Sequence, residues 1–160
     1  MAIGETVAAA TVRTALQQYA DRGVFRGFSA TRARSGAQEF RFTWLTRAPM
    51  VLSHDRAAAT LTFKELLPEV ARASPLLADV EALIRAQSGP TVVKHRRIDR
   101  RRLDVRCVHR RGKVSVVLHA KGRSEAYAVQ RGVNLVHEIF MLLQTSYPEY
   151  LWDAFGLPAE

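Results

Sequence analysis

The most constraining feature of this sequence is the alternation of apolar and polar residues on both sides of two short glycine-containing turns. Residues 24–34 and 37–46 alternate around Ser35-Gly36, and residues 103–110 and 113–120 alternate around Arg111-Gly112. A period of two is that of a half-buried strand, and a tight turn with glycine joins neighbouring antiparallel strands. The sequence therefore predicts two β-hairpins.

The two turns also predict which residues face each other. A two-residue loop at Ser35-Gly36 would pair Arg32 with Glu39. The aromatic residues of that hairpin then fall on one face: Phe40, Phe42 and Trp44. A loop at Arg111-Gly112 gives the second hairpin five predicted pairs: Cys107 with Val116, Val105 with Leu118, Leu103 with Ala120, Arg106 with Val117, and Asp104 with His119.

Apolar residues at helical spacing predict four helices. The first covers residues 5–21, and the second begins at Ser74-Pro75, where serine is a cap and proline suits the first helical position. The third runs from Ser124 to Tyr147, and a short fourth helix follows Pro148. Helices thus precede, separate and follow the strands.

Two more short strands, at residues 49–53 and 60–63, complete the predicted order. The sequence therefore predicts a single α+β domain over residues 1–160, in the order α-β-β-β-(β)-α-β-β-α. The sheet is predicted to be antiparallel, with five to six strands and with helices packed on one face.

Composition limits the class of protein further. The chain is long enough to bury a core without a disulfide or a metal, and its single cysteine, Cys107, excludes an intramolecular disulfide framework. The N-terminal residues lack the pattern of a secretory signal, and no apolar run has the length of a membrane span. We therefore expect a cytoplasmic protein without membrane association.

The element order resembles that of the YbjN-like domains and the related type III secretion chaperones. The resemblance rests on this order, on the Ser35-Gly36 hairpin, on the central helix LLADVEALIRAQ, on the hairpin at Arg111-Gly112 and on the aromatic C-terminal helix. It implies a compact protein-binding domain, often dimeric and without an active site. The strongly basic character of this chain departs from the secretion chaperones, which are typically acidic.

Basic residues are concentrated in one stretch, Lys94 to Lys113. Ten lysines and arginines stand there against Asp99 and Asp104, a net charge of +8 out of +9 for the whole chain. Arginine presents a planar fork of donors suited to carboxylate or phosphate. The candidate anion-binding residues are Lys94, Arg96, Arg97, Arg100, Arg101, Arg102, Arg110 and Arg111.

Three interpretations of this stretch remain open from the sequence. Its arginines are solvated or paired within the protein, they contact an acidic protein partner, or they contact the backbone of a nucleic acid. Phe, Trp and Tyr are absent between Phe63 and Tyr127, so the stretch contains no ring on which a base could stack. This absence disfavours single-strand recognition but not contact with phosphates.

The C-terminal helix is a second candidate surface. Its apolar residues lie on more than one side, so one side packs on the domain while the other is covered by the fold or by a partner. The candidate interface residues are Tyr147, Tyr150, Trp152 and Phe155. A homodimer is the expected assembly.

Catalytic and metal signatures are missing from the sequence. His137-Glu138 lacks the second histidine of a zinc-protease helix, since Met141 occupies that position, and no phosphate-binding glycine loop or nucleophile elbow occurs. We expect no catalytic residue, cofactor or metal. The sequence favours a non-catalytic, chaperone-like binding or adaptor module, with nucleic-acid backbone binding second and an enzyme of unknown class third.

Overall fold

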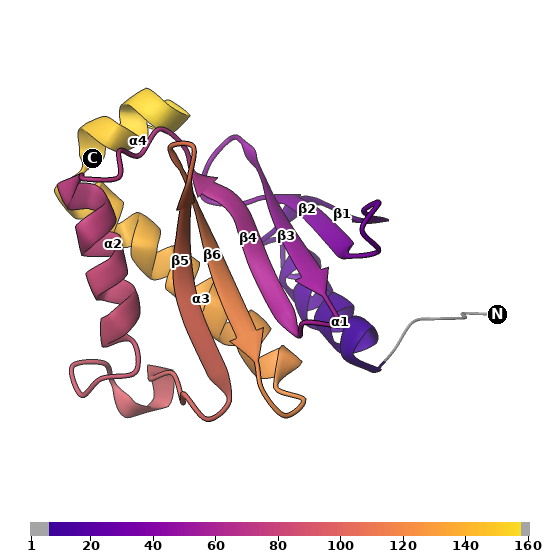
Figure 1. Ribbon diagram of the computed structural model, residues 1–160. Helices are drawn as coiled ribbons and strands as arrows, with labels where there is room; N and C mark the ends of the chain where they lie inside the picture. Colours follow the sequence, from indigo (N-terminus) through magenta and orange to yellow (C-terminus); the bar gives the residue numbers. More distant parts are fainter. Residues whose placement is uncertain (1–6, 158–160) are drawn as a thin grey trace.

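The fold is an antiparallel sheet with helices on one side, seen in a computed structural model that describes residues 7–157 (Figure 1). The strands are β1 (Arg26–Arg32), β2 (Gln38–Thr43), β3 (Pro49–Asp55), β4 (Thr60–Leu67), β5 (Leu103–Arg110) and β6 (Lys113–Ala120). The helices are α1 (Val7–Asp21), α2 (Pro75–Ala86), α3 (Glu125–Ser146) and α4 (Pro148–Phe155), and a single 3-10 turn covers Lys94–Arg96. The strand order is β1-β2-β3-β4-β6-β5, which confirms the predicted fold class.

The helices lie behind the sheet and beside its β5 edge, whereas no helix of residues 7–157 covers the front face (Figure 1). The inward side chains of the strands and the apolar stripes of the helices share one hydrophobic core, whose largest fully buried members are Phe40, Phe42, Phe63, Leu16, Leu52, Leu61, Leu67, Leu103, Leu118, Leu135, Ile139 and Leu143. Because one face is buried and the other is open, burial alternates along β2 and β3 as expected, whereas the edge strand β1 has no buried residue.

Helix α2 begins where the sequence predicted. The Ser74 side chain accepts the Leu77 N–H at 3.2 Å, and Pro75 occupies the first turn. This contact satisfies one of the amide groups that a helix start leaves without an intrahelical partner. The cap and the proline together favour a helix start at this position.

The second hairpin has the predicted register throughout. All five expected pairs are present, including Asp104 opposite His119. Arg111 and Gly112 both have positive φ, 52° and 77°, which is the two-residue turn whose twist matches that of antiparallel strands. A correct loop length was therefore enough to predict the pairing.

The predicted register of the first hairpin is wrong by one residue. Glu39 lies opposite Thr31 rather than Arg32, because the Ala33 N–H bonds to the Ala37 carbonyl and closes a three-residue loop. Gly36, with φ +88°, takes the left-handed position of that loop. Glu39 instead pairs with Lys64 of β4 at 2.8 Å.

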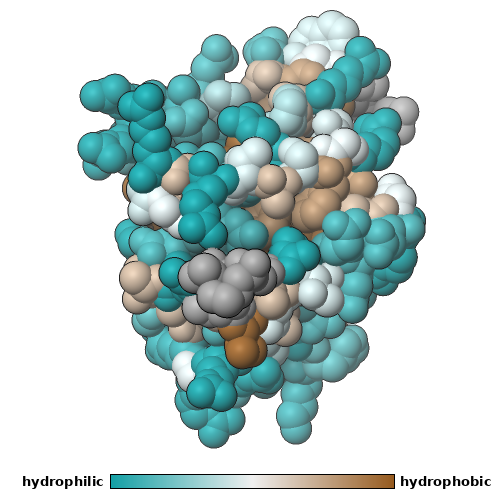
Figure 2. Space-filling view, turned by 90° about the vertical axis from the view of Figure 1, so that its right-hand side faces the viewer, coloured by the Kyte–Doolittle hydropathy of each residue, from teal (hydrophilic) through white to brown (hydrophobic). Residues whose placement is uncertain are grey.

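Strand β1 forms one edge of the sheet and carries arginines near both ends, Arg26 and Arg32. Figure 2 looks at the molecule from this side and shows a largely hydrophilic surface, with apolar side chains gathered in its upper part. Charged residues on an edge strand disfavour pairing with another chain. Strand β1 is therefore poorly suited to pairing with a partner chain.

His54 of β3 is buried in the core layer, with 2 % of its surface exposed. Burial lowers the pKa of His54, although the nearby carboxylates of Glu125 and Asp55 oppose the shift. The folded state therefore binds the proton less readily than the unfolded chain does. Stability from this residue is present above the unfolded pKa, about 6.5, and is lost as the pH falls through the folded value.

We expect the free energy of unfolding to be lower at pH 5.5 than at pH 7.5. The variant His54→Leu should show a weaker pH dependence, because it has no imidazole to protonate at this position. Urea unfolding at both pH values measures the effect. His119→Gln, at an exposed position on β6, is the control. An equal pH dependence in the wild type and in His54→Leu would contradict this account of His54.

Candidate functional site

The structure divides the basic stretch between two ends of β5 (Figure 1). Residues 94–102 precede the strand, whereas Arg110 and Arg111 lie at the β5–β6 turn. Eight residues of extended chain separate these ends by about 25 Å. The eight predicted anion-binding residues therefore do not form one surface.

Residues 94–102 form the larger cluster because the fold adds cations from other elements. Lys121 follows β6, Arg123 lies in the next turn, and Arg131 is on α3, while Arg85 is in the last turn of α2. We call this end of the molecule the basic pole: Arg85, Lys94, Arg96, Arg97, Arg100, Arg101, Arg102, Lys121, Arg123 and Arg131. The predicted register of β5 and β6 could have placed Lys121 here, and Arg123 follows two residues later, but the positions of Arg85 and Arg131 depend on helix packing.

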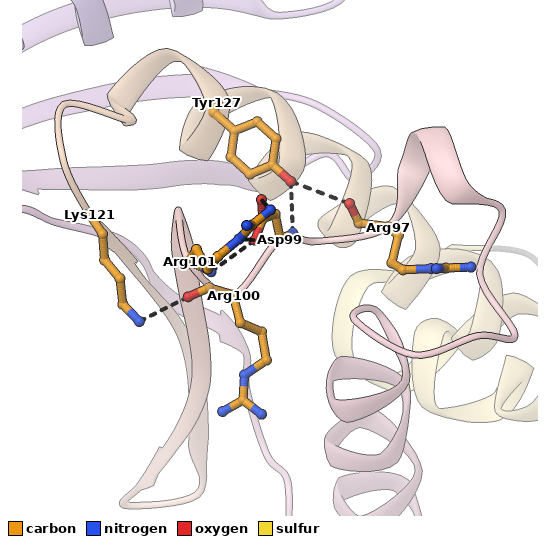
Figure 3. Close-up of polar contacts among 6 residues, drawn as sticks. All are labelled: Arg97, Asp99, Arg100, Arg101, Lys121 and Tyr127. Carbon is orange, nitrogen blue, oxygen red and sulfur yellow. Dashed lines mark hydrogen bonds and ion pairs between the residues drawn. The ribbon is translucent and has the colours of Figure 1, made fainter.

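Tyr127 of α3 fixes the backbone of the basic pole (Figure 3). Its hydroxyl accepts the Asp99 N–H at 2.9 Å and donates to the Arg97 carbonyl at 3.3 Å. The guanidinium carbons of Arg102 and Arg131 lie 3.8 and 4.9 Å from the ring centroid. These cation–π contacts and hydrogen bonds join the segment to α3 at one side chain.

Three cations of the pole bind backbone carbonyls of the same region. Arg131 donates to the His95 carbonyl at 2.7 Å, and Lys121 donates to the Arg100 carbonyl at 2.9 Å. The Arg97 guanidinium donates twice to the Val92 carbonyl, at 3.1 and 3.3 Å. These bonds satisfy carbonyls that the irregular chain would otherwise leave without a protein donor.

Both carboxylates of the pole are already engaged. Arg101 binds Asp99 through two bonds of 3.2 Å, and Lys121 lies 2.8 Å from Asp104. These hydrogen bonds are the main cause that lowers the pKa of each carboxyl group. The two acidic groups of the stretch thus neutralise Arg101 within it and Lys121 outside it.

Four exposed cations of the pole are different, because their side chains make no hydrogen bond or ion pair with any residue from 7 to 157. They are Arg85, Lys94, Arg96 and Arg123. The Arg100 guanidinium belongs with them: Figure 3 shows it extending away from Asp99 and Tyr127. The pole therefore combines a fixed backbone with cations that are available to an anion.

The candidate interface residues of α4, and Tyr147 directly before it, mostly make contacts within the fold. The Tyr147 hydroxyl donates to Asp79 at 2.5 Å, and the Tyr150 hydroxyl donates to the Pro68 carbonyl at 2.6 Å. Phe155 packs against the ring of Phe140, with centroids 5.7 Å apart. Trp152 remains 60 % exposed, so a homodimer through this helix, which stays a prediction, has Trp152 as its main anchor.

No catalytic arrangement accompanies the pole within the described part of the chain. Asp104 binds Lys121, while His119 is exposed and makes no hydrogen bond there. Burial raises the pKa of the Cys107 thiol to about 11, so the thiolate is scarce at neutral pH. Between residues 7 and 157, no group of three or more His, Cys, Asp or Glu residues could hold a metal ion. In the same part of the chain, no helix is long and apolar enough to cross a membrane.

The fold and this surface define a class, an α+β domain with a preformed cationic surface. Comparisons with protein-family models, with curated proteins and with solved structures find no match. The resemblance to the YbjN-like and secretion-chaperone domains therefore stays a prediction from element order.

Proposed function

We propose that the chain is a non-catalytic, chaperone-like binding module whose basic pole contacts an acidic protein partner. The observation that carries this proposal is that some cations of the pole bind its backbone while others are left exposed. Arg97, Lys121 and Arg131 hold the backbone, whereas Lys94, Arg96 and Arg123 project as exposed cations. A preformed field of one sign speeds the encounter with a partner of the opposite sign, and a rigid surface loses little entropy on binding.

Binding to a nucleic-acid backbone is the alternative, because phosphates also suit arginine and need no aromatic contact. Tyr127 is the only ring stacked against guanidinium groups of the pole among the described residues, and Arg102 and Arg131 both contact it. The ring is therefore not available to stack on a base. This arrangement restricts the alternative to phosphate contacts that ignore sequence.

Charge reversal at the exposed cations tests the proposal. We expect the triple variant Lys94→Glu, Arg96→Glu, Arg123→Glu to lose roughly tenfold or more of the acidic protein retained from a native-host lysate at moderate salt. These positions avoid Arg101 and Arg102, whose side chains hold the segment in place. Retention is measured on the immobilised chain, before and after nuclease treatment.

The matched control reverses three exposed arginines away from the pole, so that net charge changes equally: Arg34, Arg47 and Arg72. The control should retain the acidic protein as the wild type does. Retained material that disappears with nuclease would favour the nucleic-acid alternative. Equal loss in both variants would show that total charge, rather than the pole, controls binding.

A further inference from the structure

A depression of about 480 Å³ opens at the basic pole between the end of α2 and the edge strand β5. Its apolar lining comes from Ile84, Ile98 and Val105, together with Leu103. Its polar lining includes Arg85 of α2 and Arg100, which precedes β5. Two cations from separate elements thus border an apolar surface.

The two guanidinium groups at the depression make no hydrogen bond or ion pair with any residue from 7 to 157, although the charge of Arg100 contributes to lowering the pKa of Asp104. Arg85 is exposed, and Figure 3 shows the Arg100 side chain extending into the space between β5 and α2. Asp104 also lines the depression, but Lys121 binds its carboxylate at 2.8 Å. The depression is therefore suited to a ligand that brings its own carboxylate.

The backbone of Val105 supplies a further donor and acceptor. The Lys121 N–H bonds to the Arg102 carbonyl, so Arg102 and Lys121 form a hydrogen-bonded pair of the β5–β6 ladder. Hydrogen-bonded pairs alternate along antiparallel strands, which places the N–H and C=O of Val105 on the side away from β6. That side is the one facing the depression.

We propose that this depression binds a peptide segment of the partner that carries an acidic residue beside an aliphatic one. The carboxylate lies between Arg85 and Arg100, and the aliphatic side chain packs on Ile84, Ile98 and Val105. Main-chain groups of the segment bond to the N–H and C=O of Val105. The proposal rests on the proposed function, since it specifies the part of an acidic protein that the pole recognises.

A peptide fits these features better than a nucleic-acid backbone does. A phosphodiester can use the guanidinium groups, but it has no use for the apolar surface or for the carbonyl acceptor of Val105. A peptide uses all three, since it offers a carboxylate, an aliphatic side chain and an amide N–H. The guanidinium groups, the apolar surface and the carbonyl acceptor together therefore favour a peptide over a nucleic-acid backbone.

Selection from a displayed library of random dodecapeptides on the full chain tests the inference, followed by titration calorimetry with the selected peptide. We expect the selected peptides to contain adjacent acidic and aliphatic residues. Arg85→Ala with Arg100→Ala should weaken binding roughly tenfold to a hundredfold, because two charge-assisted hydrogen-bonding groups are removed. Ser88→Trp, which fills the depression without changing charge, should also weaken it.

The matched control is Arg110→Ala with Arg111→Ala, which removes two cations of the same stretch at the far end of β5 and should leave affinity within about twofold of the wild type. Thermal melting confirms that each variant is folded. Failure to select any peptide, selection of peptides without carboxylates, or equal weakening by the control would overturn the inference. Displacement of the peptide by a 20-base-pair DNA duplex at equal concentration would favour a nucleic-acid site instead.

The two proposals fail in different ways. If charge reversal at Lys94, Arg96 and Arg123 abolishes retention of the acidic protein while the Arg85 and Arg100 variant retains it normally, the pole is the interface and the depression is not. If none of these changes affects retention, the proposed function itself is wrong.

Discussion

Gly132→Leu is expected to lower the free energy of unfolding by about 3 kcal/mol, measured by urea denaturation. Gly132 lies on the buried side of α3, where the helix crosses β4 and β6. A Cβ atom at this position would lie 3.1 and 3.3 Å from the methyl carbons of Leu118 and 3.3 Å from the Phe63 ring. A leucine side chain has no space unless the helix moves away from the sheet.

Two further variants separate crowding from other causes. Gly132→Ala should change stability by less than about 1 kcal/mol, because the tight contacts of the new methyl group offset its better helix propensity. Asn134→Leu adds a leucine at an exposed position of the same helix and should be nearly neutral. If Gly132→Leu unfolds at the same urea concentration as the wild type, α3 does not pack on the sheet as described.

Tyr127→Ala is expected to cost about 2 to 3 kcal/mol, because it removes a half-buried ring and two hydrogen bonds at once. The loss of order in the segment 94–102 should be larger than the change in the free energy of unfolding suggests. Without the hydroxyl, the Asp99 N–H and the Arg97 carbonyl lose their described partner, and without the ring Arg102 and Arg131 lose their stacking surface. The segment 94–102 should then exchange its amide hydrogens faster.

Hydrogen exchange measured by mass spectrometry on peptides covering residues 94–102 tests this expectation. Tyr127→Phe serves as the matched variant, since it keeps the ring and removes only the hydroxyl, at a cost of about 1 kcal/mol. It should raise exchange at Asp99 and leave Arg102 in place. Unchanged protection of the segment in Tyr127→Ala would show that the carbonyl bonds of Lys121 and Arg131 alone hold the pole.

The two hairpins show what the sequence could and could not predict about the fold. At Arg111-Gly112 the alternation runs up to both turn residues, so loop length and register follow directly. At Ser35-Gly36 the flanking Arg34 and Ala37 are compatible with a loop of two or three residues. The loop has three residues, so the pairs from Ser29 to Arg32 are shifted by one, and a further irregularity between Arg26 and Ser29 shifts the pair of Arg26 again.

The basic stretch shows the same limit for the candidate site. Its position and sign are plain in the sequence, but the difference between Arg97, which binds a carbonyl, and Arg96, which is exposed, depends on the path of an irregular segment. The contribution of Tyr127 was also hidden, because it lies 28 residues from Asp99 in the chain. Contacts between residues so far apart in the chain leave no periodic pattern in the sequence.

Photo-crosslinking from within the basic pole tests the central claim most directly. A benzoylphenylalanine residue is introduced at Arg96, or at Arg111 as the control at the other end of β5, and the chain is irradiated in its native host. We expect a nuclease-resistant adduct with an acidic protein from position 96 and none from position 111. An adduct that nuclease removes, equal adducts from both positions, or no adduct from position 96 would contradict the account.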